Sequence, residues 1–598
     1  MIVRMKKVSL LCLADDKEAT LEALRNLGVM HLEPTTEIRG ADVDQARQEE
    51  QSAKSALFAL NKLGEPDARA KSGTGATAEA DTAKSFDAAA AVRRIHELGE
   101  AKRTIVDRIA HLTTEKALIE PFGDFDPEAA RRLAGHGISV RLFHVPGKKI
   151  PPTPEGAVVL ALRRDSLGLY AAVAGKGPFG YPGREVPLPA RRLSRVESDL
   201  ENARTERDTI DEELMALRAR RRELDFLLRE RRERVDYLEA GAGMGASGKI
   251  IYLRGYCPGN RIESLRGDAA KHGWGLLIED PGDTDRVPTL IRNPVWLRPI
   301  ESLFKVIRIL PGYREADVSA SFLLFMSLFF AMIVGDAGYG AVLLALTFVA
   351  RMKAKKAPAE PFRLMMIFGS MTVVWGLLTG VVFGFTNLPA PLRGLRIDWL
   401  GNNDNVMFLC LVIGAVHLSV AHLWNLVRFI NSTLAIAQLG WVSVTWTMFF
   451  AARALLLGKP FPSWYFPIAA GGFAAVVVFM TPWKKMKTEW VNHIMLPLTL
   501  MSNFGDILSY LRLFALGVAG LQLAGAFNTM ALGMGFSKPL SGLIAAIILF
   551  LGHSLNLALG LVSVLVHGIR LNALEFSMHF GLEWAGFTYE PFRTNNKE

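Results

Sequence analysis

Two stretches near the C-terminus place ionisable side chains inside otherwise apolar sequence. In the first, Ser502, Asp506, Ser509 and Arg512 follow one another at steps of four, three and three residues, a spacing that puts them on one face of a helix. LFALGVAGLQLAGAF follows Arg512, so its guanidinium has no easy route to water along its own helix. Ionisable groups inside lipid are costly and mark ion pathways, which makes this face a candidate translocation site. The structural alternative is an internal ion pair between Arg512 and either Asp506 or Glu575.

The second stretch, SVLVHGIRLNALEFSMHF, contains His567, Arg570, Asn572 and Glu575. A second intramembrane arginine on an adjacent long helix is hard to explain by packing alone. Glu575 stands five residues beyond Arg570, which is roughly 7.5 Å along a helix. We expect Glu575 in a half-channel open to the cytoplasm and His567 deeper in the membrane. The alternative is a helix-end carboxylate at the lipid headgroups.

Asp336 belongs to GDAGYG (335–340), where the glycines allow a tight reversal between two short apolar segments. It is either a cap for backbone N–H groups or a transport residue. No metal site, no cofactor site and no P-loop motif GxxxxGK[ST] is predicted. The three cysteines fit no disulfide or zinc pattern, and the net charge of +10 fits cytoplasmic loops of a membrane protein better than nucleic-acid binding.

The element that must hold these residues is a polytopic membrane domain at 319–580. Half of the 598 residues are hydrophobic, and the apolar runs gather in this part of the chain. We expect about eight spans, near 319–335, 338–352, 363–386, 405–428, 434–457, 464–481, 494–530 and 542–579, the last two strongly tilted or bent because of their length. The basic runs RMKAKKAP and KKMK follow even-numbered spans. The positive-inside rule therefore predicts that both termini, including a tail at 581–598, lie in the cytoplasm.

The charged N-terminal half predicts an elongated α/β dumbbell with an antiparallel coiled coil. A thin apolar stripe along 191–240 favours a coiled-coil helix, whose partner we expect at 42–120, interrupted by a loop near 64–81. Strand-like runs predict a distal lobe at 121–190 and a proximal lobe made from 1–41 and 247–300. This architecture is a strut rather than a catalytic domain.

SYLRLFALGVA, GDAGYG, GHSLNLALGLVSVLVHGIRLNALEF and YEPF together resemble the large membrane stator subunit of rotary V-type and A-type ATPases. In bacteria this subunit is called subunit I, and in eukaryotes it is called subunit a. The length of this chain, without large insertions, favours a prokaryotic subunit in the inner membrane. The resemblance covers the whole chain, although the N-terminal half matches in architecture more than in motif.

The resemblance implies that a stator arginine faces a rotating proteolipid ring whose subunits each carry a lipid-buried carboxylate. A guanidinium about 4 Å from such a carboxylate, at an effective dielectric constant near 20, favours its ionised form by about 4 kcal/mol. Arg512 matches the essential arginine and Arg570 the second one. His567 and Glu575 match polar positions of the last helix, whereas Asn572 stands where eukaryotic relatives often have histidine.

The resemblance also implies further partners and a non-catalytic role. These are peripheral-stalk subunits at both lobes, a central-stalk cap subunit and the lipid bilayer, with coupling of proton or sodium flow to ATP turnover elsewhere in the complex. A standalone ion-coupled secondary transporter with a regulatory coiled coil is the main alternative, and a signalling receptor is a second. A transporter usually shows paired half-repeats and its own coupling carboxylate, and neither is visible.

Overall fold

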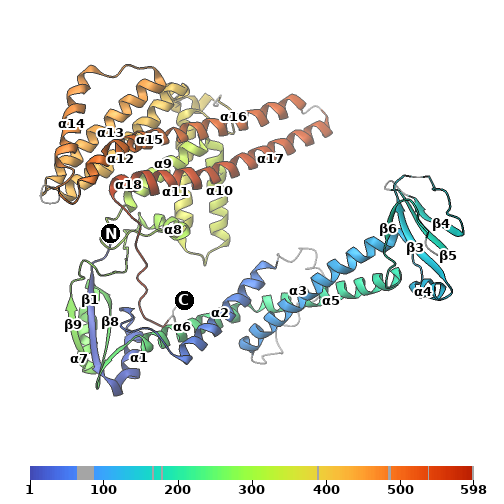
Figure 1. Cartoon of the computed structure of the whole chain (residues 1–598). Coiled ribbons are helices and arrows are strands. Elements are labelled where there is room, and N and C mark those ends of the chain that lie inside the picture. The colour runs from blue at the N-terminus through green and yellow to red at the C-terminus, as the bar shows by residue number, and fades with distance from the viewer. Residues whose placement is uncertain are drawn as a thin grey trace.

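The computed structural model describes residues 1–63, 86–147, 149–164, 168–176, 179–386, 390–482, 486–535 and 538–594. A distal β-sheet lobe, a long helical strut, a proximal β-sheet lobe and a helical bundle follow one another in space (Figure 1). The loop predicted at 64–81 lies outside the described residues.

The proximal lobe is an antiparallel sheet covered by two helices. Its strands are ordered β2-β8-β1-β9, with β7 paired to β8. Apolar side chains of β1 and β8, among them Leu10 and Leu253, pack on Leu21 and Leu24 of α1 and Leu265 of α7. The elements are β1 (Met5–Leu13), α1 (Lys17–Leu27), β2 (His31–Glu33), β7 (Gly245–Ser247), β8 (Ile250–Pro258), α7 (Ile262–His272) and β9 (Gly275–Glu279).

The strut consists of α2 (Ala41–Lys62) and α3 (Ala88–Ile119), which pack against α6 (Arg221–Ala242) and α5 (Leu193–Ala219) respectively. Lys116 pairs with Glu197 at 2.8 Å and Arg94 with Glu213 at 2.7 Å, so α3 and α5 run antiparallel to each other. The single helix predicted over 191–240 is interrupted at Arg220, whose backbone (φ −92°, ψ 22°) leaves helical geometry.

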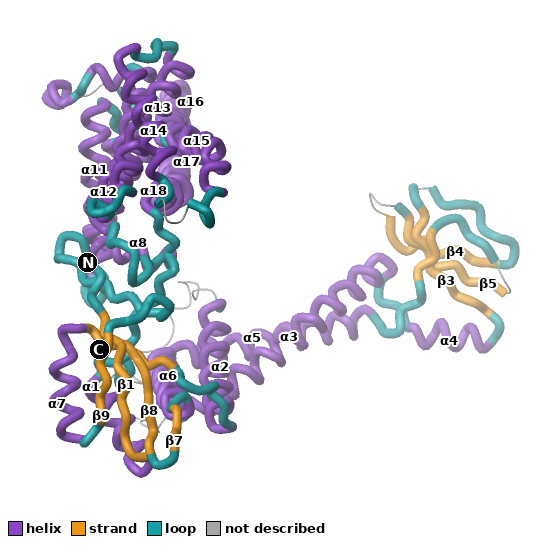
Figure 2. Tube along the Cα trace, turned by 60° about the vertical axis from the view of Figure 1, so that its left-hand side comes forward, coloured by secondary structure: helices purple, strands orange, loops and turns teal. Residues whose placement is uncertain are grey.

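The distal lobe closes the far end of the strut (Figure 2). Its sheet has the order β4-β5-β3-β6, and the described pairs are antiparallel. A small core of Phe143, Val145, Leu169 and Val173 fixes the sheet. The elements are α4 (Pro127–Gly135), β3 (Ile138–Val145), β4 (Ala157–Arg164), β5 (Leu169–Lys176) and β6 (Arg184–Val186).

The helical bundle begins with α8, which links it to the proximal lobe. Gly335, at φ +68°, ends α9, and α9 and α10 are bent by 119° at this break. The helices are α8 (Arg298–Ile307), α9 (Ser319–Val334), α10 (Ala337–Lys353), α11 (Ala359–Thr379), α12 (Asn403–Arg428), α13 (Leu434–Leu457), α14 (Phe466–Phe479), α15 (Val491–Ser509), α16 (Leu511–Met534), α17 (Pro539–Ser563) and α18 (Ser577–Phe580).

Five helical segments of the described chain are long and apolar enough to cross a membrane: Ala359–Thr379, Asn403–Arg428, Leu434–Leu457, Val491–Met534 and Pro539–Phe580. The predicted count of eight stays a prediction, because α9, α10 and the segment Ser463–Phe479 are each shorter than the roughly 20 residues of a perpendicular span. The bent pair α9–α10 fits either one broken span or a re-entrant loop.

Helices α16 and α17 form a pair that projects beyond the rest of the bundle and lies across it, whereas α10 and α11 run steeply in the same view (Figure 1). Most of the side chains of these two segments remain uncovered within the chain. The C-terminal tail then runs back along the molecule, where Thr588 bridges Thr289 and Phe592 packs into the proximal-lobe core. The last membrane helix and the base of the strut are therefore joined by this tail.

Candidate functional site

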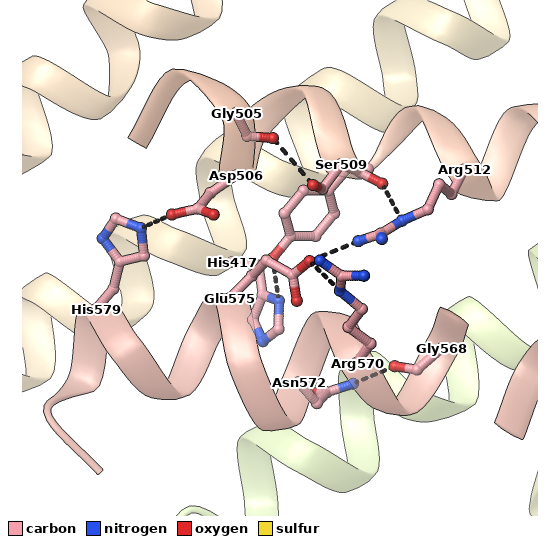
Figure 3. Close-up of polar contacts among 11 residues, drawn as sticks. His417, Gly505, Asp506, Ser509, Arg512, Gly568, Arg570, Asn572, Glu575 and His579 are labelled. Carbon is pink, nitrogen blue, oxygen red and sulfur yellow. Dashed lines mark hydrogen bonds and ion pairs between the residues drawn. The ribbon is translucent and has the colours of Figure 1, made fainter. Parts of the chain in front are cut away.

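Arg512 lies at the start of α16, two residues after Tyr510, which separates α15 from α16. Its Nη2 is 2.5 Å from Oε1 of Glu575, and its Nε donates to the carbonyl of Ser509 at 3.0 Å (Figure 3). The sequence left an internal ion pair of Arg512 as the alternative to a transport role. This ion pair is present, and its partner is Glu575, not Asp506. The Ser509 hydroxyl donates to the Gly505 carbonyl at 2.9 Å.

Arg570 shares the same carboxylate, with its Nε 3.3 Å from Oε1 of Glu575. Five residues of α-helix turn the chain through about 500°, which would place these side chains about 140° apart. The segments Val564–Gly568 and Leu571–Phe576 are instead π-helical, and the i→i+5 hydrogen bonds of a π-helix bring residues five apart onto one face. The widened helix thus lets one carboxylate contact both arginines. The position of Glu575 relative to the cytoplasmic side of the membrane stays a prediction.

The cluster of Arg512, Arg570 and Glu575 carries two positive charges and one negative charge, a net charge of +1 when all three are ionised. The Glu575 side chain is 4% exposed, against 24% for Arg512 and 54% for Arg570. The second carboxylate oxygen, Oε2, has no hydrogen-bond partner among the described residues. The uncompensated charge therefore lies on the arginine side, which is the more open one.

A second polar chain starts at Asp506, whose Oδ2 is 3.0 Å from Nε2 of His579. Nδ1 of His579 is 3.0 Å from Nε2 of His422, and Nδ1 of His422 is 2.8 Å from Oε1 of Gln438. Asp506, His579, His422 and Gln438 thus form one continuous hydrogen-bonded chain that joins α15, α18, α12 and α13. A cavity of about 390 Å³, lined partly by His422, His579 and Arg428, adjoins this chain. His579 and His422 were not predicted here, although His579 follows Glu575 by one helical turn.

A third polar group lies in the second half of α17 (Pro539–Ser563). Nδ1 of His553 is 2.7 Å from the Tyr339 hydroxyl, and its Nε2 is 3.0 Å from Oδ1 of Asn528. Asn556 donates to the Tyr339 hydroxyl at 3.0 Å and to the Gly520 carbonyl at 2.8 Å. Tyr339, Gly520 and Asn556 also line a cavity of about 230 Å³. Sequence reasoning gave these residues no functional role.

Asp336 acts as a cap. It is 3% exposed, and its carboxylate accepts from the backbone N–H groups of Gly338 at 2.7 Å, Tyr339 at 3.3 Å, Phe383 at 2.8 Å and Gly384 at 2.7 Å. These four bonds tie the α9–α10 reversal to the loop that follows α11. Of the two predicted roles, the capping role describes its contacts.

The other predicted residues are less tightly joined to the cluster. Ser502 is exposed on α15. Asn572 is fully buried and donates weakly to the Gly568 carbonyl at 3.4 Å. Nδ1 of His567 is buried without a hydrogen-bond partner among the described residues. The residues that the structure describes contain no group of three or more His, Cys, Asp or Glu side chains that could hold a metal ion.

Tyr510 anchors the segment that precedes Arg512. The side chain is fully buried, and its hydroxyl is 2.8 Å from Nδ1 of His417 on α12. Its ring packs against Gly414, where a Cβ would come within 2.6 Å of the ring. This anchor holds the start of α16 against the bundle.

The comparisons with known proteins give the chain its family. It is 31% identical over 628 residues to V-type ATP synthase subunit I 1 of Treponema pallidum, a match covering 99% of this chain and 100% of the relative. The chain belongs to the V-type and A-type ATP synthase subunit I family. V-type ATP synthase subunit I of Borreliella burgdorferi is 30% identical, with full coverage of both chains. A-type ATP synthase subunit I of Methanocaldococcus jannaschii is 26% identical, covering 68% of this chain and 64% of the relative.

No family model matches the chain. A crystal structure of the cytoplasmic N-terminal domain of subunit I, homolog of subunit a, of V-ATPase covers 46% of this chain and 99% of its own, at 19% identity and a TM-score of 0.22, a score too low to compare the two folds. Family membership and the apolar helices together make this chain a multi-pass membrane subunit of a rotary ATPase complex, which is consistent with a non-catalytic role.

Proposed function

We propose that this chain is the stator subunit that presents Arg512 and Arg570 to a rotating proteolipid ring. The observation that carries the proposal is that the two guanidiniums of Arg512 and Arg570 share the single carboxylate of Glu575, on two helical segments whose apolar windows are only 22% and 17% buried within the chain. A ring carboxylate that approaches within about 4 Å of a guanidinium gains about 4 kcal/mol for its ionised form at an effective dielectric constant near 20. That gain drives release of the bound proton or sodium ion.

Glu575 has a defined part in this cycle. It accepts from Arg512 at 2.5 Å and from Arg570 at 3.3 Å, so it holds both guanidiniums in place while no ring carboxylate is near. A passing ring carboxylate competes with it most easily for Arg570, which is the more exposed and more distant partner. Arginine suits this exchange because it stays charged where lysine could lose its proton.

Ions reach the cluster along two polar routes. Along α17 and α18, His553 and Asn556 precede Arg570, and His579 follows Glu575, so the three polar groups succeed one another along this helix. The chain of Asp506, His579 and His422 with its cavity is the cytoplasmic half-channel. The group of Tyr339, His553, Asn528 and Asn556 with its cavity is the outer half-channel, and Ser502, Ser509, His567 and Asn572 are secondary lining residues.

The soluble half is the mechanical part of the stator. Paired helices joined by cross-strut ion pairs resist bending, and the lobes at both ends offer two separate attachment points for peripheral stalks. The proximal lobe also lies next to the membrane helices, where a central-stalk cap subunit would pass. Both termini lie in the cytoplasm of a prokaryotic inner membrane in this proposal.

Ion uptake into proteoliposomes tests the proposal. The intact complex carrying Arg512→Ala is expected to lose ATP-driven ion uptake, and Arg570→Ala is expected to reduce it. Matched controls are Arg453→Ala, on the far end of α13, and the unmodified complex. Uptake at the wild-type rate with Arg512→Ala would show that the cluster is only a packing feature.

A further inference from the structure

The π-helical turn that carries Glu575 has an unusual set of hydrogen-bond partners. The Ser577 hydroxyl donates to the Asn572 carbonyl at 2.9 Å. The indole Nε1 of Trp584 donates to the Ala573 carbonyl at 3.2 Å and to the Ser577 hydroxyl at 3.0 Å. A wide turn leaves carbonyls without their α-helical partners, and buried carbonyls need donors. Two side chains therefore supply the donors that this turn lacks.

Trp584 is itself held firmly, although it lies beyond the last helix. Its backbone is in the left-handed region (φ +54°), which a side-chain-bearing residue adopts only when its surroundings impose it. Its ring packs edge-on against Phe304 of α8 and Phe322 of α9, with centroids 6.0 and 6.3 Å away.

The backbone on both sides of Trp584 is fixed as well. The Glu583 N–H donates to Oε1 of Glu315 at 2.9 Å, and the Gly586 N–H donates to the Leu310 carbonyl at 3.1 Å. A Cβ at Gly586 would lie 2.2 Å from the Pro311 carbonyl oxygen, so the chain here fits closely. The indole N–H thus has little freedom to leave the turn.

We propose that Trp584 is a positioning residue for ion translocation, and that its indole N–H, together with the Ser577 hydroxyl, holds the wide turn that sets Glu575 against Arg512 and Arg570. In an α-helical turn, Arg570 and Glu575 would separate to different faces and the shared carboxylate would be lost. This inference rests on the proposed function of the arginine cluster. It also gives the C-terminal tail a role at the membrane site in addition to its contact with the proximal lobe.

Trp584→Phe in the intact complex tests the inference, because phenylalanine keeps an aromatic ring and removes the donor. We expect hydrogen exchange of the backbone amides of 571–580 to become about fivefold to tenfold faster, as expected for the loss of one hydrogen bond. We also expect fewer ions moved per ATP hydrolysed. Trp399→Phe, at an exposed tryptophan in the short 3₁₀ helix Asp398–Gly401, is the matched control and should change neither value.

A double-mutant cycle with Glu575→Gln separates positioning from general destabilisation. If Trp584 acts through Glu575, Trp584→Phe has no further effect on ion movement in the Glu575→Gln background. Independent effects of the two substitutions, or unchanged exchange and pumping in Trp584→Phe, would overturn the inference. Normal pumping by Glu575→Gln alone would instead count against the proposed function.

Ser577 supplies a second variant in case Trp584→Phe does not assemble. Ser577→Ala removes the hydroxyl that joins the indole to the Asn572 carbonyl. It is expected to reproduce the faster hydrogen exchange and the lower number of ions moved per ATP hydrolysed. Ser577→Thr keeps the hydroxyl and is expected to restore both. Equal behaviour of the alanine and threonine variants would overturn the inference.

Discussion

Removing the two arginines one at a time should have unequal effects on stability. Arg512 is 24% exposed and lies 2.5 Å from a carboxylate that is 4% exposed, so Arg512→Ala breaks a largely buried ion pair. Breaking a buried pair costs about 3–5 kcal/mol, and the lower end applies because Arg570 still contacts Glu575. Arg570 is 54% exposed, so Arg570→Ala is expected to cost only about 0–1 kcal/mol, like a surface pair.

The double variant Arg512→Gln with Glu575→Gln separates structure from transport. Removing both charges leaves no unpaired buried ion, and we expect stability within about 1 kcal/mol of the unmodified chain. Ion uptake should nevertheless stay abolished, because no positive charge remains at position 512. Stability is measured by denaturant titration of the detergent-solubilised complex, and uptake in proteoliposomes. Equal stability losses in Arg512→Ala and Arg570→Ala, or ion uptake by the double variant, would refute the reasoning.

Three further predictions concern residues that hold the site or the tail. Asp336→Asn replaces a carboxylate that accepts hydrogen bonds from four backbone N–H groups. Because hydrogen bonds to a charged acceptor contribute about 1.5–3 kcal/mol each, we expect about 3 kcal/mol lower stability in a denaturant titration. An unchanged titration midpoint would contradict the capping role. Gly414→Ala places a Cβ 2.6 Å from the Tyr510 ring, so we expect about 2 kcal/mol of destabilisation and reduced ion uptake. If the Gly414→Ala variant keeps the stability and the uptake of the unmodified protein, the ring is not fixed. Burial lowers the pKa of His31 from its ordinary value of 6.5, so the docked tail favours the neutral ring that contacts the Glu590 backbone. Docking is therefore complete above pH 6.5 and weakens as the pH falls below it, which hydrogen exchange of residues 587–594 at two pH values would detect; His31→Gln should remove this dependence.

The ionisable members of the translocation cluster were predictable because lipid makes such residues rare. Arg512, Arg570 and Glu575 stand out inside apolar runs, and each needs a partner or a function. Their mutual contact was not predictable, since an α-helical phase separates residues 570 and 575. No simple residue period predicts a π-helix, and its side-chain donors come from Ser577, the first residue of α18, and from Trp584, beyond the end of that helix.

The two half-channel groups show a different limit. His422 and His579 are 157 residues apart in sequence, and Tyr339 and His553 are 214 apart, so only the packing of the helices brings them together. A single histidine on an apolar helix is as consistent with a core hydrogen bond as with an ion route. The sequence therefore does not indicate which histidines meet.

The strut and its lobes followed from local patterns. The strand-like runs of the two lobes and the charged helices with a thin apolar stripe all appear in the structure. The break at Arg220 was missed, because arginine is a good helix former and nothing local marks the interruption. The docking of Phe592 into the proximal lobe was missed as well, since a tail of 14 described residues carries no periodic signal.

Photo-crosslinking from the uncovered helices of the intact complex tests most directly whether the arginine-bearing face meets the ring. A benzoylphenylalanine at Val562, 56% exposed on α17 two helical turns before Arg570, is expected to crosslink the proteolipid subunit. The same probe at Ile468, 48% exposed on α14 at the opposite side of the bundle, is expected to give no ring adduct (Figure 1). A ring adduct from Ile468 but none from Val562 would contradict the proposal that α16 and α17 form the ring-facing surface.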